Sequence, residues 1–423
     1  MRIARLLTIV VPLLLAAQPV AASGDGFVRL FDGQTFTNWQ RFNDPGDVFK
    51  IEDGMLHVLD VPEGPRDFAY LITDREYTNY HFKVRYRWGQ KKFAPRAFDK
   101  RDAGILYHVV GPDVIWPRSV ESQIQEGDTG DIFLVSGTGA ATTVAPNVAL
   151  PERQYLAGGE LYAQIDGRVV KAETVDSLTD WNLTEIVVTG TESAHIVNGV
   201  VVARMSDMTE PGATQRVPLD RGRILLQAEG AEIFYDAVEI KEFTDLGVPP
   251  PPGGSVLFDN IEMCPGCGDR RTDTTFQDFT LHVEFNVPPT SVGAAEQDRG
   301  NSGIYLQGRY ELQVLDSFGW PLADQNDAGA IYGLEDAAEN AARPSGTWQS
   351  HDITFRSARW ANDTKTENAR VSVVWNGVPV HTEMEFAGPT AGGGPETPAA
   401  GPIVFQEHGH AVRYRNVWLT PLQ

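Results

Sequence analysis

The feature that most constrains this chain is an internal repeat: six segments of the first half recur in the same order in the second half. The matched pairs are 30–33 with 257–260, 77–86 with 276–285, 102–126 with 301–316, 181–186 with 348–353, 198–199 with 376–377, and 222–235 with 401–414. Collinear matches of this kind indicate that one structural unit has been duplicated. We therefore expect two domains of the same fold, each large enough for a core of its own.

The repeated segments show the period of two that is typical of β-strands. Along 310–314, apolar side chains alternate with Glu311 and Gln313. The dipeptide Asn-Gly at 198–199, and again at 376–377, suits a tight hairpin turn with positive φ between Val-rich strands. Because long helical periods are scarce, we predict an all-β chain of two tandem sandwiches, each of two packed antiparallel sheets.

Composition predicts where the domains begin and end. Residues 1–22 have a positive start, an apolar run too short to span a membrane, and small residues up to Ala22, which together indicate a signal peptide cleaved near Ala22. Residues 246–255 form a Pro/Gly linker, which leaves the domains at 23–245 and 256–423. We expect an exported protein, periplasmic or secreted, that does not span the membrane.

Charge limits the class of partner. The chain has 57 acidic and 35 basic residues, a formal net charge of −22. This balance repels nucleic acid and anionic lipid, so no nucleic-acid partner is expected. It is compatible with a neutral or a cationic ligand.

The two cysteines, Cys264 and Cys267, flank a Pro-Gly turn. In an exported protein such a pair is expected to close a local disulfide. A thioredoxin-like role would need a strand that leads into a helix, which the following residues do not indicate. A zinc site would need two more ligands nearby.

A row of polar residues recurs along one strand face of each half. A carboxylate, an amide and a guanidinium on one face suit either a solvated surface or the floor of a polar groove, and the pattern by itself leaves both open. The recurrence of the row favours the groove. The rows comprise Arg309, Glu311, Gln313 and Asp316 in the second half, and Arg118, Glu121, Gln123 and Glu126 in the first.

Taken together, the motifs resemble the 3-keto-disaccharide hydrolase domain family, in two tandem copies that cover nearly all of the mature chain. The motifs are Leu-Phe-Asp-Gly at 30–33 followed by Trp39, then 300–305, 309–317, 329–333, Trp348 and 406–409, with 123–128 and 227–232 resembling another branch of the family. The resemblance implies concanavalin A-like jelly rolls with a concave, sugar-facing sheet. It also implies cleavage of 3-keto-glycosides in a concave polar groove, by hydrolysis or by 1,2-elimination with hydration.

Such a reaction needs a base for the C2 proton, a donor that stabilises the enolate and an acid for the leaving oxygen. A divalent metal ion, of unknown identity, could take the donor's part. In the second half the catalytic candidates are His408, Glu311 and Asp316, and the substrate-binding candidates are Asn301, Arg309, Gln313, Gln406 and Trp320. In the first half they are Glu121, Glu126 and Glu229, with His108, Arg118 and Gln123 as binders.

The two halves differ at two of these positions, since Glu229 stands where His408 stands and Asp102 stands where Asn301 stands. Whether both halves are active is therefore open. Residues 128 and 131 add two aspartates, which suit either a divalent oxygen-ligand site or an acidic loop.

Three function classes stay open, and each takes a carbohydrate. The first is a 3-keto-glycoside hydrolase or lyase. The second is a non-catalytic carbohydrate-binding protein; in either class Trp116 and Trp320 could serve as stacking platforms. The third is an ordinary glycosidase whose carboxylate pair lies within one polar row.

Overall fold

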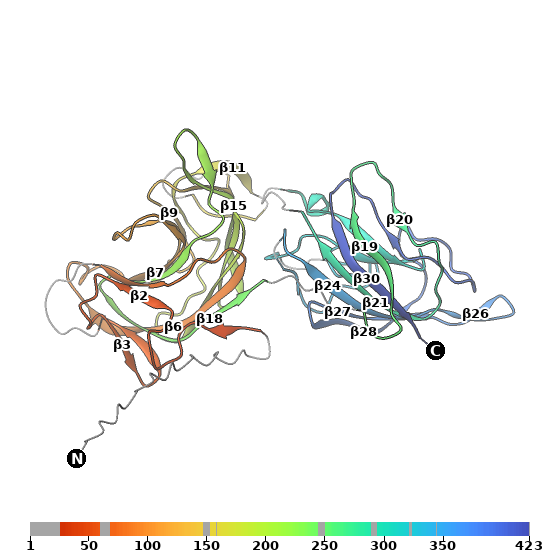
Figure 1. Ribbon diagram of the computed structural model, residues 1–423, viewed down its shortest axis with the longest axis horizontal. Coiled ribbons are helices and arrows are strands. Elements are labelled where there is room, and N and C mark those ends of the chain that lie inside the picture. Colours follow the sequence, from red (N-terminus) through yellow and green to blue (C-terminus); the bar gives the residue numbers. More distant parts are fainter. Residues whose placement is uncertain are drawn as a thin grey trace, which may run out of the picture.

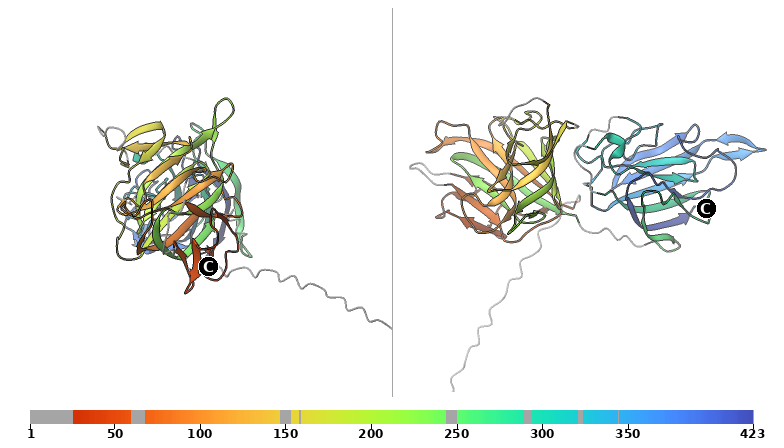
Figure 2. Two further views of the ribbon diagram at one scale, coloured as in Figure 1. Left: turned by 90° about the vertical axis from the view of Figure 1, so that its left-hand side faces the viewer. Right: turned by 90° about the horizontal axis from the view of Figure 1, so that it is seen from above.

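The computed structural model describes residues 26–59, 68–146, 153–157, 159–243, 250–288, 294–320, 324–343 and 345–422. The predicted signal peptide, residues 1–22, and residues 246–249 of the predicted linker lie outside these ranges. Among the described residues, the strands that precede residue 243 pair only with one another, as do those that follow residue 254. Figure 1 shows two β bodies side by side, and Figure 2 shows the same separation from above.

Within its described residues the first half contains a sheet of eleven strands and a sheet of seven, and the strands of both sheets pair antiparallel, while one isolated bridge between Gln154 and Val170 is parallel. In spatial order the larger sheet has β11 (Glu160–Ile165), β10 (Gly139–Val144), β15 (Val200–Pro211), β14 (Glu192–Val197), β13 (Asn182–Thr189), β6 (Tyr80–Lys92), β18 (Ala231–Glu242), β4 (Met55–Val58) and β3 (Phe49–Glu52), with β1 (Val28–Arg29) beside β18 and β16 (Arg216–Pro218) beside β15. The smaller sheet has β12 (Gly167–Val169), β9 (Ile132–Val135), β8 (Arg118–Gln125), β7 (Asp102–Val110), β17 (Arg223–Ala228), β5 (Ala69–Thr73) and β2 (Trp39–Phe42).

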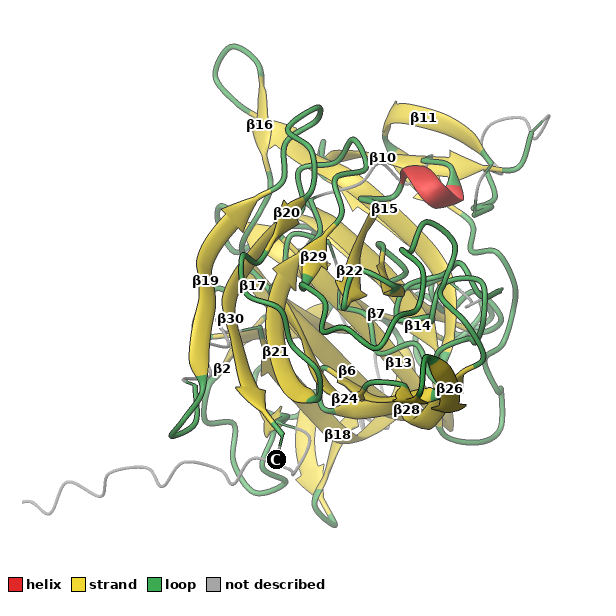
Figure 3. Ribbon diagram, turned by 90° about the vertical axis from the view of Figure 1, so that its right-hand side faces the viewer, coloured by secondary structure: helices red, strands yellow, loops and turns green. Residues whose placement is uncertain are grey.

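The second half repeats the plan with a sheet of six strands and a sheet of four (Figure 3). The larger sheet has β19 (Ser255–Glu262), β30 (Arg413–Pro421), β21 (Phe279–Asn286), β24 (Gln349–Arg356), β27 (Ala369–Trp375) and β28 (Val378–Phe386). The smaller sheet has β20 (Arg270–Arg271), β29 (Val404–Phe405), β22 (Ser302–Leu306) and β23 (Tyr310–Val314), and β25 (Arg359–Ala361) pairs with β26 (Thr364–Glu367). A 3₁₀ turn, η1 (Glu296–Asp298), is the one helical element of the described residues, so no helix there is long and apolar enough to cross a membrane.

Alternation along the strands explains how each half forms a core. In β6, Tyr80, Phe82, Val84 and Tyr86 are buried, while Arg85, between Val84 and Tyr86, is exposed. One cluster of buried apolar residues fills the space between the sheets of the first half, and a second cluster does so in the second half. The prediction of an all-β chain of antiparallel jelly-roll sandwiches is confirmed.

The predicted hairpin turns have the backbone that their residues favour. Asn198 and Gly199 have φ of 50° and 83° between β14 and β15. Asn376 and Gly377 have φ of 51° and 88° between β27 and β28. Asparagine and glycine tolerate this left-handed region best, so the Asn-Gly dipeptide fixes the turn type in both halves. Elsewhere, a disulfide joins Cys264 to Cys267.

Candidate functional site

The two polar rows lie on equivalent hairpins, β7–β8 in the first half and β22–β23 in the second. The paired positions are Gly104–Gln123 and Leu106–Glu121 in the first half, and Gly303–Gln313 and Tyr305–Glu311 in the second. A Cβ atom on Gly303 would lie 2.2 Å from Glu311 Oε1, and a Cβ on Gly104 would lie 2.2 Å from Glu121 Oε1. Each glycine therefore leaves room for a carboxyl group that lies directly over its strand.

In the second half this carboxyl group borders a pocket of about 190 Å³, which we call the C-terminal pocket. Five of the ten lining residues are predicted site residues. The lining consists of Gln297, Asn301, Tyr305, Glu311, Gln313, Tyr332, Ala391, Gly392, Gln406 and His408.

Glu311 is the buried acid of the C-terminal pocket, with 3% of its surface exposed. Its Oε2 accepts a hydrogen bond of 2.7 Å from the Tyr305 hydroxyl. Burial raises the pKa of Glu311 to about 7, and the hydrogen bond from Tyr305 lowers it only in part. A carboxyl group with this pKa can accept a proton and release it again near neutral pH.

Amide side chains surround Glu311. Gln313 donates to Gln297 Oε1 at 3.3 Å, and Asn301 donates to the same oxygen at 3.0 Å. The Oε1 atoms of Gln313 and Gln406 are buried and make no hydrogen bond within the described residues. Buried acceptors without a donor are costly, so both oxygens are suited to accept hydrogen bonds from ligand hydroxyls. His408 follows β29 and is exposed on the pocket lining.

One wall of the C-terminal pocket comes from the glycine-rich loop that precedes β29. The Glu311 backbone N–H donates to Thr390 Oγ1 at 2.9 Å, so the loop is fixed to the outer edge of β23, where Leu312 also forms a β-bridge with Ile331. A Cβ on Gly393 would lie 2.0 Å from the Arg309 carbonyl oxygen, and one on Gly392 would lie 2.8 Å from the Tyr305 hydroxyl. The low-complexity sequence of this loop therefore allows its backbone to pack against the site.

Three predicted residues of the second half lie outside the C-terminal pocket. The guanidinium of Arg309 donates to Gln307 Oε1 at 2.8 Å and to Thr397 Oγ1 at 2.7 Å. Asp316 is buried with its Oδ2 3.7 Å from a guanidinium nitrogen of Arg204, which belongs to the first half. The Trp320 ring lies 4.4 Å from the Arg299 guanidinium carbon. These side chains hold loops and the contact between the halves together.

The first half has a pocket of about 400 Å³ at the equivalent place, which we call the N-terminal pocket. Glu121, Gln123 and Glu229 are the predicted site residues that line it, together with Trp116, which was predicted as a stacking platform. The complete lining is Arg96, Asp102, Trp116, Glu121, Gln123, Gln125, Phe133, Leu134, Val135, Arg168 and Glu229.

Three buried carboxyl groups dominate the N-terminal pocket. Arg96 contacts Asp102 and lies 3.3 Å from Glu229 Oε1, and Gln125 donates to Asp102 at 2.7 Å. Burial and the charge of Asp102 raise the pKa of Glu121 to about 8. Burial and the charges of Asp102 and Glu121 raise the pKa of Glu229 to about 9. Near neutral pH the cluster therefore holds protons.

The remaining predictions for the first half lie outside this pocket. Glu126 pairs with Arg101, whose guanidinium nitrogen is 2.6 Å from Oε1. Arg118 donates to Glu210 at 2.7 Å. His108 is fully buried with Nε2 3.0 Å from the Gly190 carbonyl oxygen, and burial lowers its pKa to about 4.

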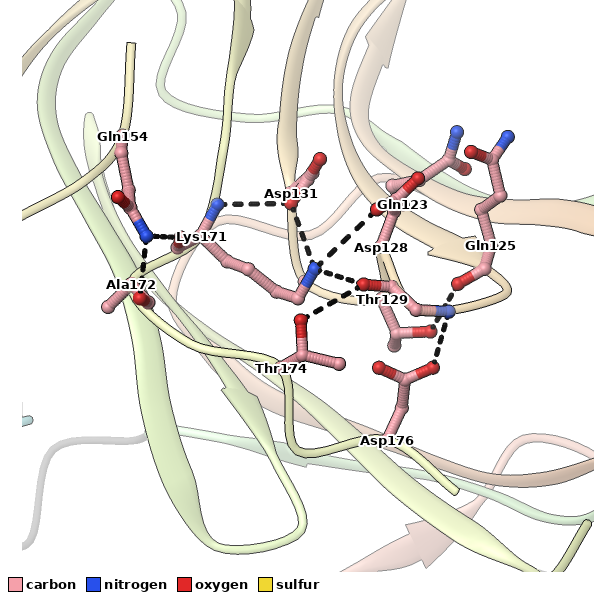
Figure 4. A network of polar contacts seen from close by, with 12 residues as sticks. Gln123, Gln125, Asp128, Thr129, Asp131, Gln154, Lys171, Ala172, Thr174 and Asp176 are labelled. Carbon is pink, nitrogen blue, oxygen red and sulfur yellow. Dashed lines mark hydrogen bonds and ion pairs between the residues drawn. The ribbon is translucent and has the colours of Figure 1, made fainter. Parts of the chain in front are cut away.

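The two aspartates of the acidic loop are neutralised by Lys171, whose contacts Figure 4 shows, and by Arg168. Lys171 is buried and donates to the Gly127 carbonyl oxygen at 2.6 Å, and its Nζ lies 3.4 Å from Asp131. Arg168 donates to Asp131 at 2.8 Å and lies 3.5 Å from Asp128. Nowhere in the described ranges do three or more His, Cys, Asp or Glu residues form a set that could hold a metal ion.

Some pocket residues were not predicted from sequence. In the C-terminal pocket, Tyr305 comes from the motif 300–305 that carries the resemblance, yet nothing in the pattern shows that its hydroxyl reaches Glu311. In the N-terminal pocket, Arg96 comes from the loop after β6, far in sequence from the carboxyl groups. The other unpredicted lining residues are Gln297, Tyr332, Ala391 and Gly392 of the C-terminal pocket, and Gln125, Phe133, Leu134, Val135 and Arg168 of the N-terminal pocket.

Comparison with solved structures finds several partial matches. A candidate glycosyl hydrolase from Parabacteroides distasonis is 31% identical, covering 43% of this chain and 81% of that chain with a TM-score of 0.36. Carbohydrate-binding module CBM66 from Bacillus subtilis is 7% identical (48% and 96% covered, TM-score 0.30). A Bacillus licheniformis β-glucanase is 11% identical (51% and 97% covered, TM-score 0.32). Among curated proteins no sequence matches the chain.

A family model describes both halves of the chain. The model of the 3-keto-alpha-glucoside-1,2-lyase-like domain matches residues 26–241 and again residues 255–420. Together the two matches include both pockets and nearly every described residue. The family is named for action on a glucoside, so a carbohydrate-active function follows. The chain therefore belongs to the 3-keto-alpha-glucoside-1,2-lyase-like domain family, of which it contains two tandem copies.

Proposed function

We propose that the C-terminal pocket cleaves 3-keto-glycosides, with Glu311 as the base that removes the C2 proton. The observation that carries this proposal is the position of Glu311: buried, held by the Tyr305 hydroxyl at 2.7 Å, and with its pKa raised by burial to about 7. A general base works best when its pKa lies near the working pH. The surrounding amides supply neutral donors and acceptors for sugar hydroxyls.

The chemistry of the substrate explains why one base of this kind is sufficient. A ketone at C3 acidifies the proton at C2, so Glu311 takes that proton and the C2–H electron pair forms an enolate. The enolate collapses to a C1=C2 double bond as the C1–O bond breaks. The leaving oxygen takes a proton from His408, which lies at the exposed side of the pocket. Addition of water across the double bond completes a net hydrolysis.

Donors to the C3 oxygen stabilise the enolate in this scheme. The side-chain amide of Gln406 lines the same pocket as Glu311 and can donate an N–H group, whereas the Asn301 amide already donates to two oxygens of Gln297. Donors that are already in place when charge develops lower the barrier more than donors that must reorganise. The Tyr305 hydroxyl is directed at Glu311, and burial together with the hydrogen bond to Glu311 raises the pKa of Tyr305. Tyr305 therefore stays protonated and orients the base.

The geometry of this pocket gives less support to an ordinary carboxylate-pair glycosidase. That mechanism needs two carboxyl groups on opposite sides of one glycosidic bond. Asp316, the predicted partner of Glu311, does not line the pocket and pairs with Arg204 instead. Glu311 is the one carboxylic acid among the ten lining residues.

The test compares a 3-keto-glucoside with the plain glucoside of the same aglycone. We expect product from the 3-keto-glucoside alone, with kcat/KM rising as the pH increases towards about 7, because Glu311 must be ionised. At higher pH kcat/KM should fall again, because His408 must carry the proton that it donates. Glu311→Gln keeps the acceptor for Tyr305 but loses the base, so turnover should fall by roughly 10²- to 10⁴-fold.

Glu407→Gln is the matched control, since Glu407 caps the Gly409 N–H and does not line the pocket. It should retain full activity. Full activity of Glu311→Gln would refute the assignment of the base. Equal cleavage of the plain glucoside would indicate an ordinary glycosidase, and binding without turnover would indicate a carbohydrate-binding protein.

A further inference from the structure

The two pockets share a framework but differ in charge. In both pockets a carboxyl group lies over a glycine of the neighbouring strand, Glu311 over Gly303 and Glu121 over Gly104. In both, a glutamine follows two residues later on the strand of the glutamate, and it pairs with that glycine. They differ where Asp102 replaces Asn301 and where Glu229 replaces His408. Each replacement puts a carboxyl group where the C-terminal pocket has a neutral amide or an imidazole.

The carboxyl groups of the N-terminal pocket outnumber the cations that face them. Asp102, Glu121 and Glu229 are 2%, 4% and 2% exposed, so all three are buried. Arg96 contacts Asp102 and Glu229. Arg168, the other cation of the lining, is held by Asp131 at 2.8 Å. The pocket lining therefore has one available guanidinium, that of Arg96, for three buried carboxyl groups.

Unpaired polar atoms lie beside this cluster. Gln227 is 3% exposed, and neither atom of its amide makes a hydrogen bond to a described residue. A Cβ on Gly104 would lie 2.0 Å from Gln227 Oε1 and 2.2 Å from Glu121 Oε1, so these two side chains end at the same place. Asp102 Oδ1 and Glu121 Oε1 also have no hydrogen-bond partner in the described residues. Buried polar groups of this number are expected to receive a ligand with several donors.

We propose that the N-terminal pocket binds a sugar that carries a protonated amine in place of a hydroxyl. Asp102 and Glu229 would face the ammonium group, and Glu121 would face a ring hydroxyl. Trp116, which is 37% exposed and lines the pocket, offers an aromatic face for the ring. The inference rests on the proposed function in one respect, that the framework shared with the C-terminal pocket takes a sugar ring.

Binding of the amine is linked to proton release. In the free pocket, burial and mutual repulsion raise the pKa of Glu121 to about 8 and that of Glu229 to about 9, with Asp102 and Arg96 facing both groups. An ammonium group favours the ionised carboxylates, so it displaces their protons. The pocket therefore binds the amine more tightly as the pH approaches these pKa values, provided that the amine stays protonated.

The experiment is calorimetric titration of the full-length protein with methyl glucosaminide, its N-acetylated form and methyl glucoside. At neutral pH we expect the amine to bind at least roughly tenfold more tightly than either neutral sugar, because a buried charge pairs with it. Titration in two buffers of different ionisation heat should show protons released with the amine alone. Equal affinities, or an amine that binds without proton release, would overturn the proposal.

Variants test whether the preference for the amine arises in the N-terminal pocket. Asp102→Asn combined with Glu229→His copies the C-terminal pocket and should abolish the preference for the amine. Glu173→Gln, at an exposed position of the same half, should leave it intact. If the double variant does not fold, the comparison of the three sugars on the wild-type protein still decides the question.

His408→Ala separates this proposal from the proposed function. It should remove 3-keto-glycoside turnover and keep amine binding, so failure of one hypothesis does not imply failure of the other. Amine preference that disappears in His408→Ala, or that survives the double change at Asp102 and Glu229, would contradict the assignment.

Discussion

At the scale of the residue, two glycines position the carboxyl groups of the two pockets. Gly303 and Gly104 do not need glycine for their backbone angles, since neither has a positive φ. They need it because the neighbouring carboxyl oxygen occupies the space of a Cβ. Burial of these carboxyl groups is also the main cause of the raised pKa of Glu311 and Glu121.

Gly303→Ala should therefore reduce activity without preventing folding. The added Cβ would lie 2.2 Å from Glu311 Oε1, so the carboxyl group must shift away from its hydrogen bond with Tyr305. We expect kcat/KM for a 3-keto-glycoside to fall roughly 10- to 100-fold, the scale of a misplaced catalytic group. Gly104→Ala makes the same change in the other half and should leave this activity intact. Equal loss in both variants would count against the C-terminal pocket as the reacting site.

At the scale of the element, β24 carries a histidine into the core of the second half. His351 is fully buried, stacks on Phe285 at 4.7 Å, and neither ring nitrogen has a hydrogen-bond partner in the described residues. Burial, with further contributions from His381 and His282, lowers the pKa of His351 from 6.5 to about 3. The folded protein thus holds this ring neutral over most of the acidic range.

This histidine should make the protein sensitive to acid. The pKa of His351 is lower in the folded than in the unfolded chain. Its contribution to the free energy of unfolding is therefore fully present above pH 6.5 and is lost as the pH falls towards about 3. Linkage gives a loss of about 2 kcal/mol of unfolding free energy between pH 7 and pH 5 from this one group. His351→Phe should flatten the pH dependence by that amount, as measured by urea unfolding at both pH values. An unchanged slope would show that the ring titrates in the folded protein as it does in the unfolded chain.

At the scale of the whole molecule, the two halves touch through polar groups. Arg204 belongs to β15, which lies on the side of the first half that faces the second half in Figure 1. Its guanidinium lies 3.7 Å from Asp316 and 5.7 Å from the Trp320 ring. Ser345 donates to Glu192 on β14 at 2.8 Å. Burial and the charge of Asp316 raise the pKa of Glu192 to about 7, so Arg204 is the cation that offsets two acids at this contact.

Arg204→Ala should weaken the coupling between the halves. Removing one partner of a buried ion pair leaves a buried charge without compensation, which costs about 3 kcal/mol. We expect calorimetry to show the two halves unfolding at more widely separated temperatures than in the wild type. Arg221→Ala, at a residue 63% exposed by its side chain, is the control and should change nothing. A single shared transition in both variants would show that the contact contributes little.

Export is a prediction about the chain as a whole and concerns residues outside the described ranges. If residues 1–22 are a signal peptide, the exported protein should begin after Ala22. N-terminal sequencing of protein recovered from the periplasm or the medium tests this directly. Mature protein that still begins at Met1 would disprove the prediction.

Local pattern in the sequence determined the strands and the repeat. Strand periodicity is a property of neighbouring residues, so the order of side chains along the chain is sufficient to predict β23 and its outward pair, Glu311 and Gln313. Asn-Gly turns likewise depend on the backbone of two residues. The duplication made both polar rows visible because each half repeats the same order of strands.

Only the tertiary structure decided which polar residues share a pocket. Arg309 and Glu311 lie in one polar row, yet Arg309 is turned to the loop at 397–399 while Glu311 borders the pocket. Asp316 forms an ion pair with Arg204 of the other half. Arg96 contacts Asp102 and Glu229 from a loop that is distant in the sequence from Glu229. A buried charge takes whichever partner the packed chain brings within a few ångströms, and that distance is not contained in the spacing of residues along the sequence.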